Sequence, residues 1–532
     1  MKGIAYYWCA VLGYSAFMVY IGYAIQRGYR GQGVSAFEFW MAKRELPGWW
    51  LAASLTAGWL MLGWVGFGMS QVYMYGVTGL WILPVPWFIL CLIVVAAVPL
   101  VRRIGAVSVP QAMAQRYGPS ARALTAVCSF MVFISWTQAE LFMAGTLMSP
   151  FLGVAPWVCM VVAMAPVIVY TYLGGFRAVV LTDVLQFGLM AIFMLILAGV
   201  AVTAAQRASG GQILAALANA APPLAGKGKA LSPWVLGWLF PIVLLVGYLP
   251  GWLIEQDLTL RLQAARTTRS ARNAAVLGLV LITIFVLVLP SVVAFCALVA
   301  FPPEHGAPPA LLGPQAYQIV SAFIARLPCW LAGFMLVGIV ACQMSTVNTF
   351  GQVAAMPLAY DIVDPLLQRG KITPQRRMQW ARWLTVVVLL FGLLLAFLSV
   401  SLADVYYLSS GVLSASIAVP AFFMFWKRTT LPAALAAAVV GFLGTVGGYW
   451  YEYKFLQSAD PHGAHYYLNA LPALLHGSFM YNYIAAGVLL STVTILVVSL
   501  LTTRPDAARV ASVKAAPVDD RREFMRQALP AE

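Results

Sequence analysis

The sequence predicts an all-α, polytopic membrane protein with about 13 transmembrane helices. Of its 532 residues, 62% are hydrophobic and only 9% are charged, whereas soluble globular chains carry about 25% charged residues. Apolar stretches of about 20 residues, the length that crosses a bilayer as a helix, recur with short polar breaks along almost the whole chain. The expected spans are residues 4–26, 48–71, 77–101, 122–148, 155–173, 179–204, 232–256, 274–301, 329–360, 378–401, 404–426, 431–450 and 478–502.

The first span, residues 4–26, is too long for a signal peptide and lacks a small-residue cleavage site, so it is expected to remain as a helix. With the N-terminus outside, 26 of the 32 Lys and Arg residues fall in cytosolic loops or the tail. Positively charged short loops stay in the cytoplasm. We therefore expect a multi-pass protein of the plasma (inner) membrane, with the N-terminus outside and the C-terminus cytosolic.

The net charge of +15 is explained by this topology and by contact with anionic lipid headgroups. No nucleic-acid partner is needed. The tail, residues 503–532, is rich in Ala, Arg and Asp and is expected to be disordered. It is also too short for a kinase or cyclase domain, which argues against a receptor.

Cysteine and histidine give no sign of a catalytic or structural metal site. The seven Cys residues have no C-x-x-C spacing and are expected to be small core residues. His305, His462, His465 and His476 fall in predicted outer loops. H-E-x-x-H, G-x-S-x-G and P-loop motifs are absent from the sequence, so an enzyme or an ATP-driven pump is not supported.

Asp183 is a carboxylate at the boundary between two apolar stretches, in the segment TYLGGFRAVVLTDVLQF of residues 171–187. An aspartate at the centre of a membrane helix costs roughly 2.5–3.5 kcal/mol, so such residues usually face a bundle interior or a water-filled path. Asp183 therefore indicates an ion or solute transporter. The alternative is a carboxylate near the cytosolic helix end that only pairs with Arg177 or a neighbouring loop.

Two spans carry Gly and Pro where a helix would break. They are residues 48–71 and 232–256, the first spans of two five-helix stretches, 48–204 and 232–426. Corresponding interrupted helices are typical of binding sites in secondary transporters, although small residues also favour close helix packing. The residues concerned are Gly58, Gly63, Gly66 and Gly68 in the first span and Pro241, Gly247, Pro250 and Gly251 in the second.

Ser345 and Thr346 are adjacent hydroxyls in the apolar segment 329–361, one turn after Cys342. Hard cations such as Na⁺ favour neutral hydroxyl and carbonyl oxygens of this kind. A Ser-Thr pair is also often bonded back to the preceding turn of its own helix. Both readings stay open from these residues alone.

Several separated motifs resemble the sodium:solute symporter family in the family's order, over residues 35–440. TYLGGFRAVVLTDVLQ resembles its most recognisable signature, and QMSTVNT its sodium-site helix. AFEFWMAKRELPGWW is similar to the segment before the first core helix, QDLTLRLQAARTTRSAR to the cytosolic loop after the second broken helix, and VPAFFMFWKRTTLPAALAAAVVG to the last core helix and its exit loop.

The resemblance implies a LeuT-type core of two inverted five-helix repeats, with one helix before it and two after. It implies a coupling Na⁺ ion at the carbonyls of Ala53 and Thr56, with Asp183 along the ion's exit path. The residues opposite would be Cys342, Ser345 and Thr346. The implied regions are 1–47, an extra helix and cytosolic loop; 48–204, the first repeat; 205–231, an extracytoplasmic loop; 232–430, the second repeat; 431–502, two C-terminal helices; and 503–532, the tail.

Two positions depart from the family pattern. Leu55 stands where proline-transporting members carry an Asp near the sodium site, and Pro86 stands where sugar-transporting members carry a Glu. Neither proline nor glucose is therefore expected as the substrate.

The candidate substrate residues are aromatic and polar side chains expected near the bilayer midplane. Glu140 lies about eighteen residues into its helix, where it could pair with a cationic substrate group, bind a proton, or sit protonated in a hydrogen bond to Gln138 or to a neighbouring helix. Aromatic faces can cover an apolar or cationic ligand, but the same residues could serve as packing or interface anchors. The set is Trp59, Gly63, Trp136, Gln138, Glu140 and Tyr248.

The expected function is sodium-coupled import of a small organic solute, such as an amino acid or carboxylate, by alternating access. The partners would be the solute and the lipid bilayer. A proton-coupled transporter, with Glu140 or Asp183 titrating, and a receptor or sensor on a transporter scaffold are the alternatives.

Overall fold

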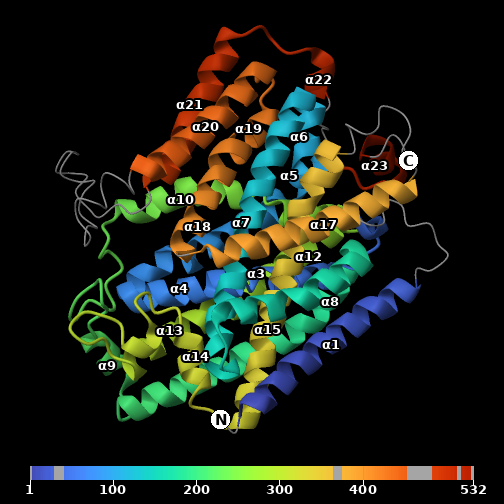
Figure 1. Ribbon diagram of the computed structural model, residues 1–532. Coiled ribbons are helices and arrows are strands. Elements are labelled where there is room, and N and C mark those ends of the chain that lie inside the picture. The colour runs from blue at the N-terminus through green and yellow to red at the C-terminus, as the bar shows by residue number, and fades with distance from the viewer. Residues whose placement is uncertain are drawn as a thin grey trace.

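The computed structural model describes residues 3–28, 41–363, 374–399, 401–451, 482–511 and 517–528. These residues form an all-α protein, as predicted, with two isolated β-bridges and no strand among them (Figure 1). The helices are α1 Ile4–Gly28, α3 Gly48–Trp59, α4 Leu62–Tyr75, α5 Pro84–Ile104, α6 Val109–Tyr117, α7 Pro119–Leu152, α8 Pro156–Ala208, α9 Ile213–Asn219, α10 Leu239–Trp252, α11 Gln256–Ala264, α12 Thr268–Ile282, α13 Leu289–Ala300, α14 Ile319–Ile324, α15 Cys329–Met356, α17 Pro374–Phe397, α18 Leu402–Val412, α19 Val419–Phe422, α20 Leu431–Tyr451, α21 Asn482–Leu501, α22 Ala507–Ala511 and α23 Arg521–Ala528.

In the described residues, 10 helical stretches are long and apolar enough to cross a membrane, or up to 12 if each of two bent pairs is one span. Helix α8 has 53 residues. It is not straight, because Tyr170 and Gln186 lie within hydrogen-bonding reach of each other, whereas a straight helix would separate them by about 24 Å. Its first part, Pro156–Tyr172, is apolar but shorter than the others. The total of 13 spans therefore stays a prediction.

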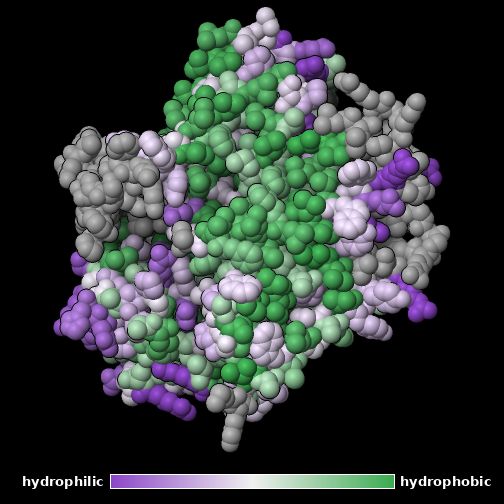
Figure 2. All heavy atoms as spheres, viewed as in Figure 1, coloured by the Kyte–Doolittle hydropathy of each residue, from purple (hydrophilic) through white to green (hydrophobic). Residues whose placement is uncertain are grey.

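The outer surface matches a lipid environment. Large apolar side chains are exposed along α17, α20 and α21, among them Val387, Leu394, Leu443 and Leu500. Figure 2 shows a broad hydrophobic band between two hydrophilic ends of the molecule. Burying these side chains in lipid removes them from water, which is the main favourable term for such a surface.

Both predicted helix breaks are present. Helix α3 ends at Trp59 and α4 begins at Leu62, with a bend of 59°. The backbone changes direction at Leu60 and Met61, where Met61 is extended (φ −66°, ψ 118°). Helices α10 and α11 form the second broken pair, bent by 47° after Gly251 and Trp252. Glycine and proline lower the cost of leaving the helix at these points.

The expectation of a disordered tail is wrong for residues 517–528. Phe524 and Val518 are buried, and the amide of Val518 donates to the carbonyl of Arg102 at 3.1 Å. The guanidinium of Arg44 lies over the Phe524 ring at 4.4 Å. The tail docks because a few apolar side chains and backbone groups find partners beside α5, which composition alone does not reveal.

Not all basic residues of the predicted cytosolic side face lipid headgroups or water. Arg102 is fully buried at the end of α5, where it donates to the carbonyls of Gln263 (3.0 Å) and Ala265 (2.9 Å) and pairs with Asp519 at 2.7 Å. Arg116 is also buried and donates to the carbonyl of Thr429 at 2.9 Å. These arginines satisfy backbone carbonyls at the end of α11 and in the turn before α20.

Replacing Asp519 with Asn should lower the free energy of unfolding by about 1 kcal/mol at neutral pH, because Arg102 loses its charged partner and Asp519 is half exposed. Burial opposes ionisation of Asp519, but hydrogen bonds from Arg102 and Thr268 hold its pKa below the ordinary value. A carboxylate with a lowered folded-state pKa stabilises above its unfolded pKa of about 3.9, and this contribution is lost as pH falls through the folded pKa.

Thermal melting of the detergent-purified protein checks this. The melting temperature of Asp519→Asn should be lower than that of wild type at pH 7, and the difference should shrink below about pH 4. Asp506→Asn is the matched control, because Asp506 is exposed and only caps the amide of Ala508. Equal melting temperatures at pH 7, or a difference that persists in acid, would contradict the ion pair between Arg102 and Asp519 that docks the tail.

Candidate sodium and substrate site

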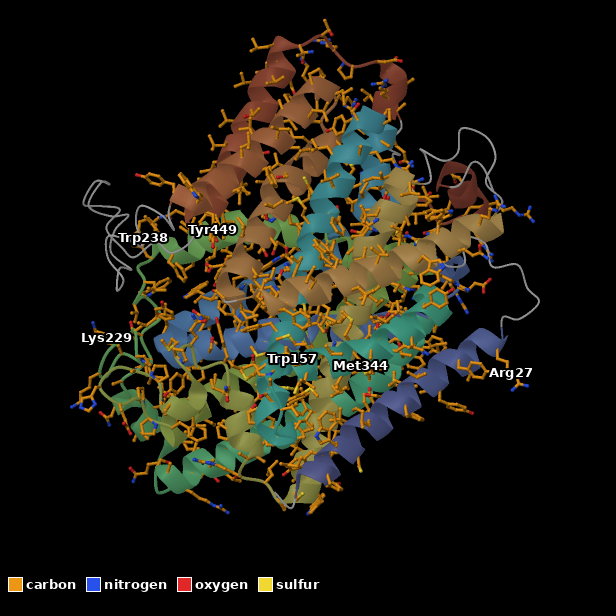
Figure 3. The ribbon with its side chains drawn as sticks, viewed as in Figure 1. Arg27, Trp157, Lys229, Trp238, Met344 and Tyr449 are labelled. Carbon is orange, nitrogen blue, oxygen red and sulfur yellow. The ribbon has the colours of Figure 1, made fainter. Side chains whose placement is uncertain are left out.

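Helices α3 and α15 meet at Ser345. Its hydroxyl lies 3.1 Å from the carbonyl of Ala57 on α3 and 3.1 Å from the carbonyl of Cys342 on its own helix. The Thr346 hydroxyl donates to the Cys342 carbonyl at 3.0 Å. Met344, the neighbour of Ser345, lies between Arg27 and Lys229, which mark opposite ends of the molecule (Figure 3). Hydroxyl and carbonyl oxygens therefore converge in the interior.

The predicted sodium ligands lie on the two helices that meet here. Cys342, Ser345 and Thr346 are buried within about one turn of α15. On α3, the carbonyl of Thr56 accepts the Leu60 amide at 2.8 Å, and Ala53 lies one turn before Ala57.

The carbonyl that contacts Ser345 is that of Ala57, which the sequence did not single out. Both readings of the Ser-Thr pair hold, because the hydroxyls bond back to Cys342 and also line the junction. Each hydroxyl oxygen keeps lone pairs for a cation.

Asp183 belongs to a buried ion-pair network centred on Arg261. The Arg261 guanidinium lies 3.2 Å from the Asp183 carboxylate and 3.5 Å from that of Asp257. Ser54 donates to Asp183 at 2.6 Å and accepts from Arg261 at 3.0 Å. The hydroxyl of Thr349 accepts from Arg261 at 3.1 Å. The network joins α3, α8, α11 and α15.

The resemblance of QDLTLRLQAARTTRSAR to a cytosolic loop places Arg261 in that loop, and this expectation is wrong. It lies in the short helix α11 and is only 2% exposed. Trp59, a predicted substrate residue, donates to Asp257 at 3.1 Å and is thereby tied to the network. The i,i+4 spacing of Asp257 and Arg261 was the sequence signal that could have indicated this pair.

Glu140, a buried residue of α7, contacts the start of α4. Its Oε1 atom accepts the Gly63 amide at 3.0 Å and the Tyr406 hydroxyl at 2.7 Å. A Cβ atom at Gly63 would collide with that hydroxyl and lie 2.9 Å from Glu140 Oε1. Glycine at 63 is thus required for the carboxylate to approach the helix end.

Aromatic rings surround this point from α3, α4, α5, α10 and α18. The Trp64 and Tyr406 ring centroids are 4.5 Å apart. Tyr248 stacks on Trp252 at 4.9 Å and on Tyr407 at 5.3 Å. Apart from Tyr248 and Trp59, the sequence did not indicate these rings, because aromatic residues are common throughout membrane helices. The aromatic cluster consists of Trp59, Trp64, Trp87, Tyr248, Trp252, Tyr406 and Tyr407.

Gln138 does not join Glu140. It donates to Ser399 and lines a cavity of about 450 Å³ together with Asp404 and Ser409. Trp136 donates to Ser409 at 2.8 Å. The possible hydrogen bond between Glu140 and Gln138 is replaced by the bonds from Gly63 and Tyr406, since these two α7 residues are separated by about 200° around the helix.

The comparisons with known proteins identify the family. The model of the Sodium:solute symporter family matches residues 39–441, most of the chain. The chain belongs to this family. The family resemblance drawn from the motifs is thus confirmed, and the protein is a sodium-coupled symporter rather than an enzyme.

Two known symporters are similar to this protein in sequence. It is 25% identical over 471 residues to a sodium/glucose cotransporter of Vibrio parahaemolyticus, covering 80% of this chain and 82% of that one. It is 26% identical over 363 residues to a sodium/proline symporter of Escherichia coli (strain K12), covering 66% and 68%.

Solved structures share the fold. A Na⁺-coupled sialic acid symporter in a substrate-bound, outward-open state has a TM-score of 0.72 at 17% identity, covering 94% of this chain and 98% of that one. A nucleobase-cation-symport-1 family transporter in a closed conformation has a TM-score of 0.54 at 11% identity, covering 91% and 98%. These likenesses confirm the expected transporter fold.

Replacing Arg261 with Met should lower the free energy of unfolding by about 3–5 kcal/mol, because two buried carboxylates lose their cation. The triple variant Arg261→Met, Asp183→Asn, Asp257→Asn should recover most of this loss. Thermal denaturation of the purified symporter measures both, with Arg207→Met as an exposed control. If Arg261→Met alone were as stable as wild type, the buried network would not be formed.

Gly63→Ala should destabilise the symporter by about 1–3 kcal/mol, because the added methyl group collides at the start of α4. Gly188→Ala is the matched control, since a Cβ there meets nothing within 4 Å and alanine favours the helix. Melting temperatures of the two variants check this. Equal stability of both would contradict the close approach of Glu140 and Tyr406 to Gly63.

Proposed function

We propose that the protein imports a small organic solute together with Na⁺ by alternating access. Na⁺ is held where α3 meets α15, by the hydroxyls of Ser345 and Thr346 and by carbonyls of Ala53, Thr56 and Cys342. The Ala57 carbonyl joins this set. The observation that carries the proposal is the Ser345 hydroxyl, which lies 3.1 Å from carbonyls on both helices. A cation there replaces hydrogen bonds that otherwise hold the helices together.

The solute binds beside this junction, between the Glu140 carboxylate and the aromatic cluster. Trp59, Gly63, Trp136 and Tyr248 lie on the helices that enclose the position. Broken helices typically frame the substrate site in secondary transporters. Gln138, which lines the other cavity, is left out of this site.

The Arg261 network closes the path of the ion and the solute toward the cytosolic side of the plasma membrane. Thr349 follows Ser345 and Thr346 by about one turn of α15, and Ser54 precedes Ala57 by about one turn of α3. The ion must therefore pass Asp183 on its way inward. Arg27 and Lys229 lie at opposite ends of the molecule (Figure 3). An N-out, C-in orientation places Arg27 on the cytosolic side, where the loops and the tail carry 26 of the 32 Lys and Arg residues.

The inward sodium gradient supplies the work. At a potential of about 100 mV, one entering Na⁺ contributes about 2.3 kcal/mol, which sustains roughly fifty-fold accumulation of an uncharged solute. Sodium that stabilises the outward-facing arrangement raises solute affinity by linkage. Transport of both follows when the Arg261 network opens.

The test is a sodium-dependent rise in melting temperature of the purified protein, compared between NaCl and KCl. A ligand that binds only the folded state stabilises it by about 2.7 kcal/mol at a hundred times its dissociation constant. Ser345→Ala combined with Thr346→Ala should abolish this rise. Thr203→Ala, which removes an exposed hydroxyl bonded to its own helix, should keep it.

A double variant that retains the full sodium effect would refute the proposed site. Proton coupling is the rival, because Glu140 is buried without a basic partner among the described residues. Proteoliposome uptake that persists without Na⁺ and collapses with the pH gradient would establish it instead.

A further inference from the structure

The start of α4 is an anion-binding position that the protein itself fills. The first amides of a helix have no partners within it and carry about half a positive charge. In transporters with broken helices, such an end often faces an anionic group of the substrate. Here Glu140 Oε1 accepts the Gly63 amide at 3.0 Å. A substrate carboxylate would therefore meet a carboxylate that already occupies its place.

The second oxygen of Glu140 is left for a ligand. Glu140 is 0% exposed, and its Oε2 atom has no hydrogen-bond partner among the described residues. Glu140 accepts from the Gly63 amide and the Tyr406 hydroxyl, but a buried charge without a full counter-charge remains unfavourable. The helix end offsets only about half of a unit charge. The remaining negative charge calls for a positive group.

No basic side chain of the described part of the chain supplies that group. Arg261 is engaged by Asp183 and Asp257 on the other side of the α3 break. The arginines of the other described ion pairs bond to Asp361, Asp519 and Glu45. The positive charge opposite Glu140 is therefore left to a proton, to the coupling Na⁺ or to the solute itself.

The neighbouring rings favour a cation as well. Tyr406, whose hydroxyl donates to Glu140 at 2.7 Å, has its ring 4.5 Å from that of Trp64. Trp64 in turn lies 6.0 Å from Trp252 and 6.3 Å from Trp87. Tryptophan and tyrosine faces attract ammonium groups, most strongly where water is excluded. The cluster offers a carboxylate or phosphate no basic side chain, and its unpartnered donors among the described residues, Trp64 Nε1, Trp87 Nε1 and the Tyr248 hydroxyl, are neutral.

From these contacts we propose that the solute is a small organic cation, an amine or quaternary ammonium compound without a carboxylate. Glu140 is its counter-charge, and the Trp64 and Tyr406 rings cover it. This inference rests on the proposed function, because it assigns the substrate class of the same site. It also makes Glu140 a specificity-determining residue.

The experiment is a thermal-shift titration of the purified full-length protein with five probes, each in NaCl and in KCl. Choline and ethanolamine represent the two kinds of ammonium. Glycine betaine adds a carboxylate to the choline-like head, and lactate and glucose represent anions and neutral solutes. Choline or ethanolamine should raise the melting temperature in NaCl, whereas betaine, lactate and glucose should not.

Glu140→Gln is the matched variant, because its amide oxygen still accepts from Gly63 while the charge is lost. It should weaken the binding of the cationic probe roughly 30-fold or more and keep the melting-temperature rise caused by Na⁺ alone. Tyr406→Phe, which retains the charge, should weaken it less.

The wild-type screen decides the matter even if Glu140→Gln does not fold. Stabilisation by betaine, lactate or glucose, with none by the two cations, would overturn the proposal. Unchanged cation affinity in a folded Glu140→Gln protein would also overturn it. Cation binding that is equal in NaCl and KCl would instead overturn sodium coupling and leave the substrate class standing.

Discussion

A helix that breaks inside a membrane frees backbone groups that lipid cannot satisfy, and the interior of this protein is arranged around that constraint. At the first break, the Ala57 carbonyl accepts from Ser345 and the Gly63 amide donates to Glu140. At the second, the Ser414 hydroxyl donates to the Tyr248 carbonyl at 3.3 Å near the end of α10 and accepts from the Gly251 amide at 3.0 Å. Each partner comes from a different helix, so the freed groups hold the bundle together. The same groups become ligands when an ion or solute replaces those partners.

The Arg261 network, which closes the cytosolic side of the sodium site, is held by buried ion pairs rather than by freed backbone groups. Arg261, Asp183 and Asp257 are fully desolvated, and the attraction between such charges is largely offset by the loss of hydration. Opening the network toward the cytosol would let water hydrate all three groups. A buried ion-pair network can therefore define the geometry of the closed conformation without making that conformation too stable to open. Hydrogen bonds from Ser54 and to Thr349 set its geometry and tie it to the two sodium-site helices.

Much of the fold could be predicted because it depends on local signals. Hydropathy predicts the spans, and Gly58, Gly63 and Gly251 lie within a few residues of the breaks. The role of Arg261 could not be predicted. Helix α11 has only 9 residues, so in the sequence its charged residues cannot be distinguished from those of a cytosolic loop. The docking of the tail depends on packing between distant segments, which periodicity does not encode, whereas the separation of Gln138 from Glu140 follows from their spacing along one helix.

The central claim is that the broken α3–α4 helix and α15 together form a cation site. A high-resolution cryo-EM map of the protein in NaCl, compared with one in KCl, tests it most directly. We expect a sodium-dependent density peak among the hydroxyls of Ser345 and Thr346 and the carbonyls of α3. A continuous helix through Leu60 and Met61, or two maps without any difference at this junction, would contradict the account.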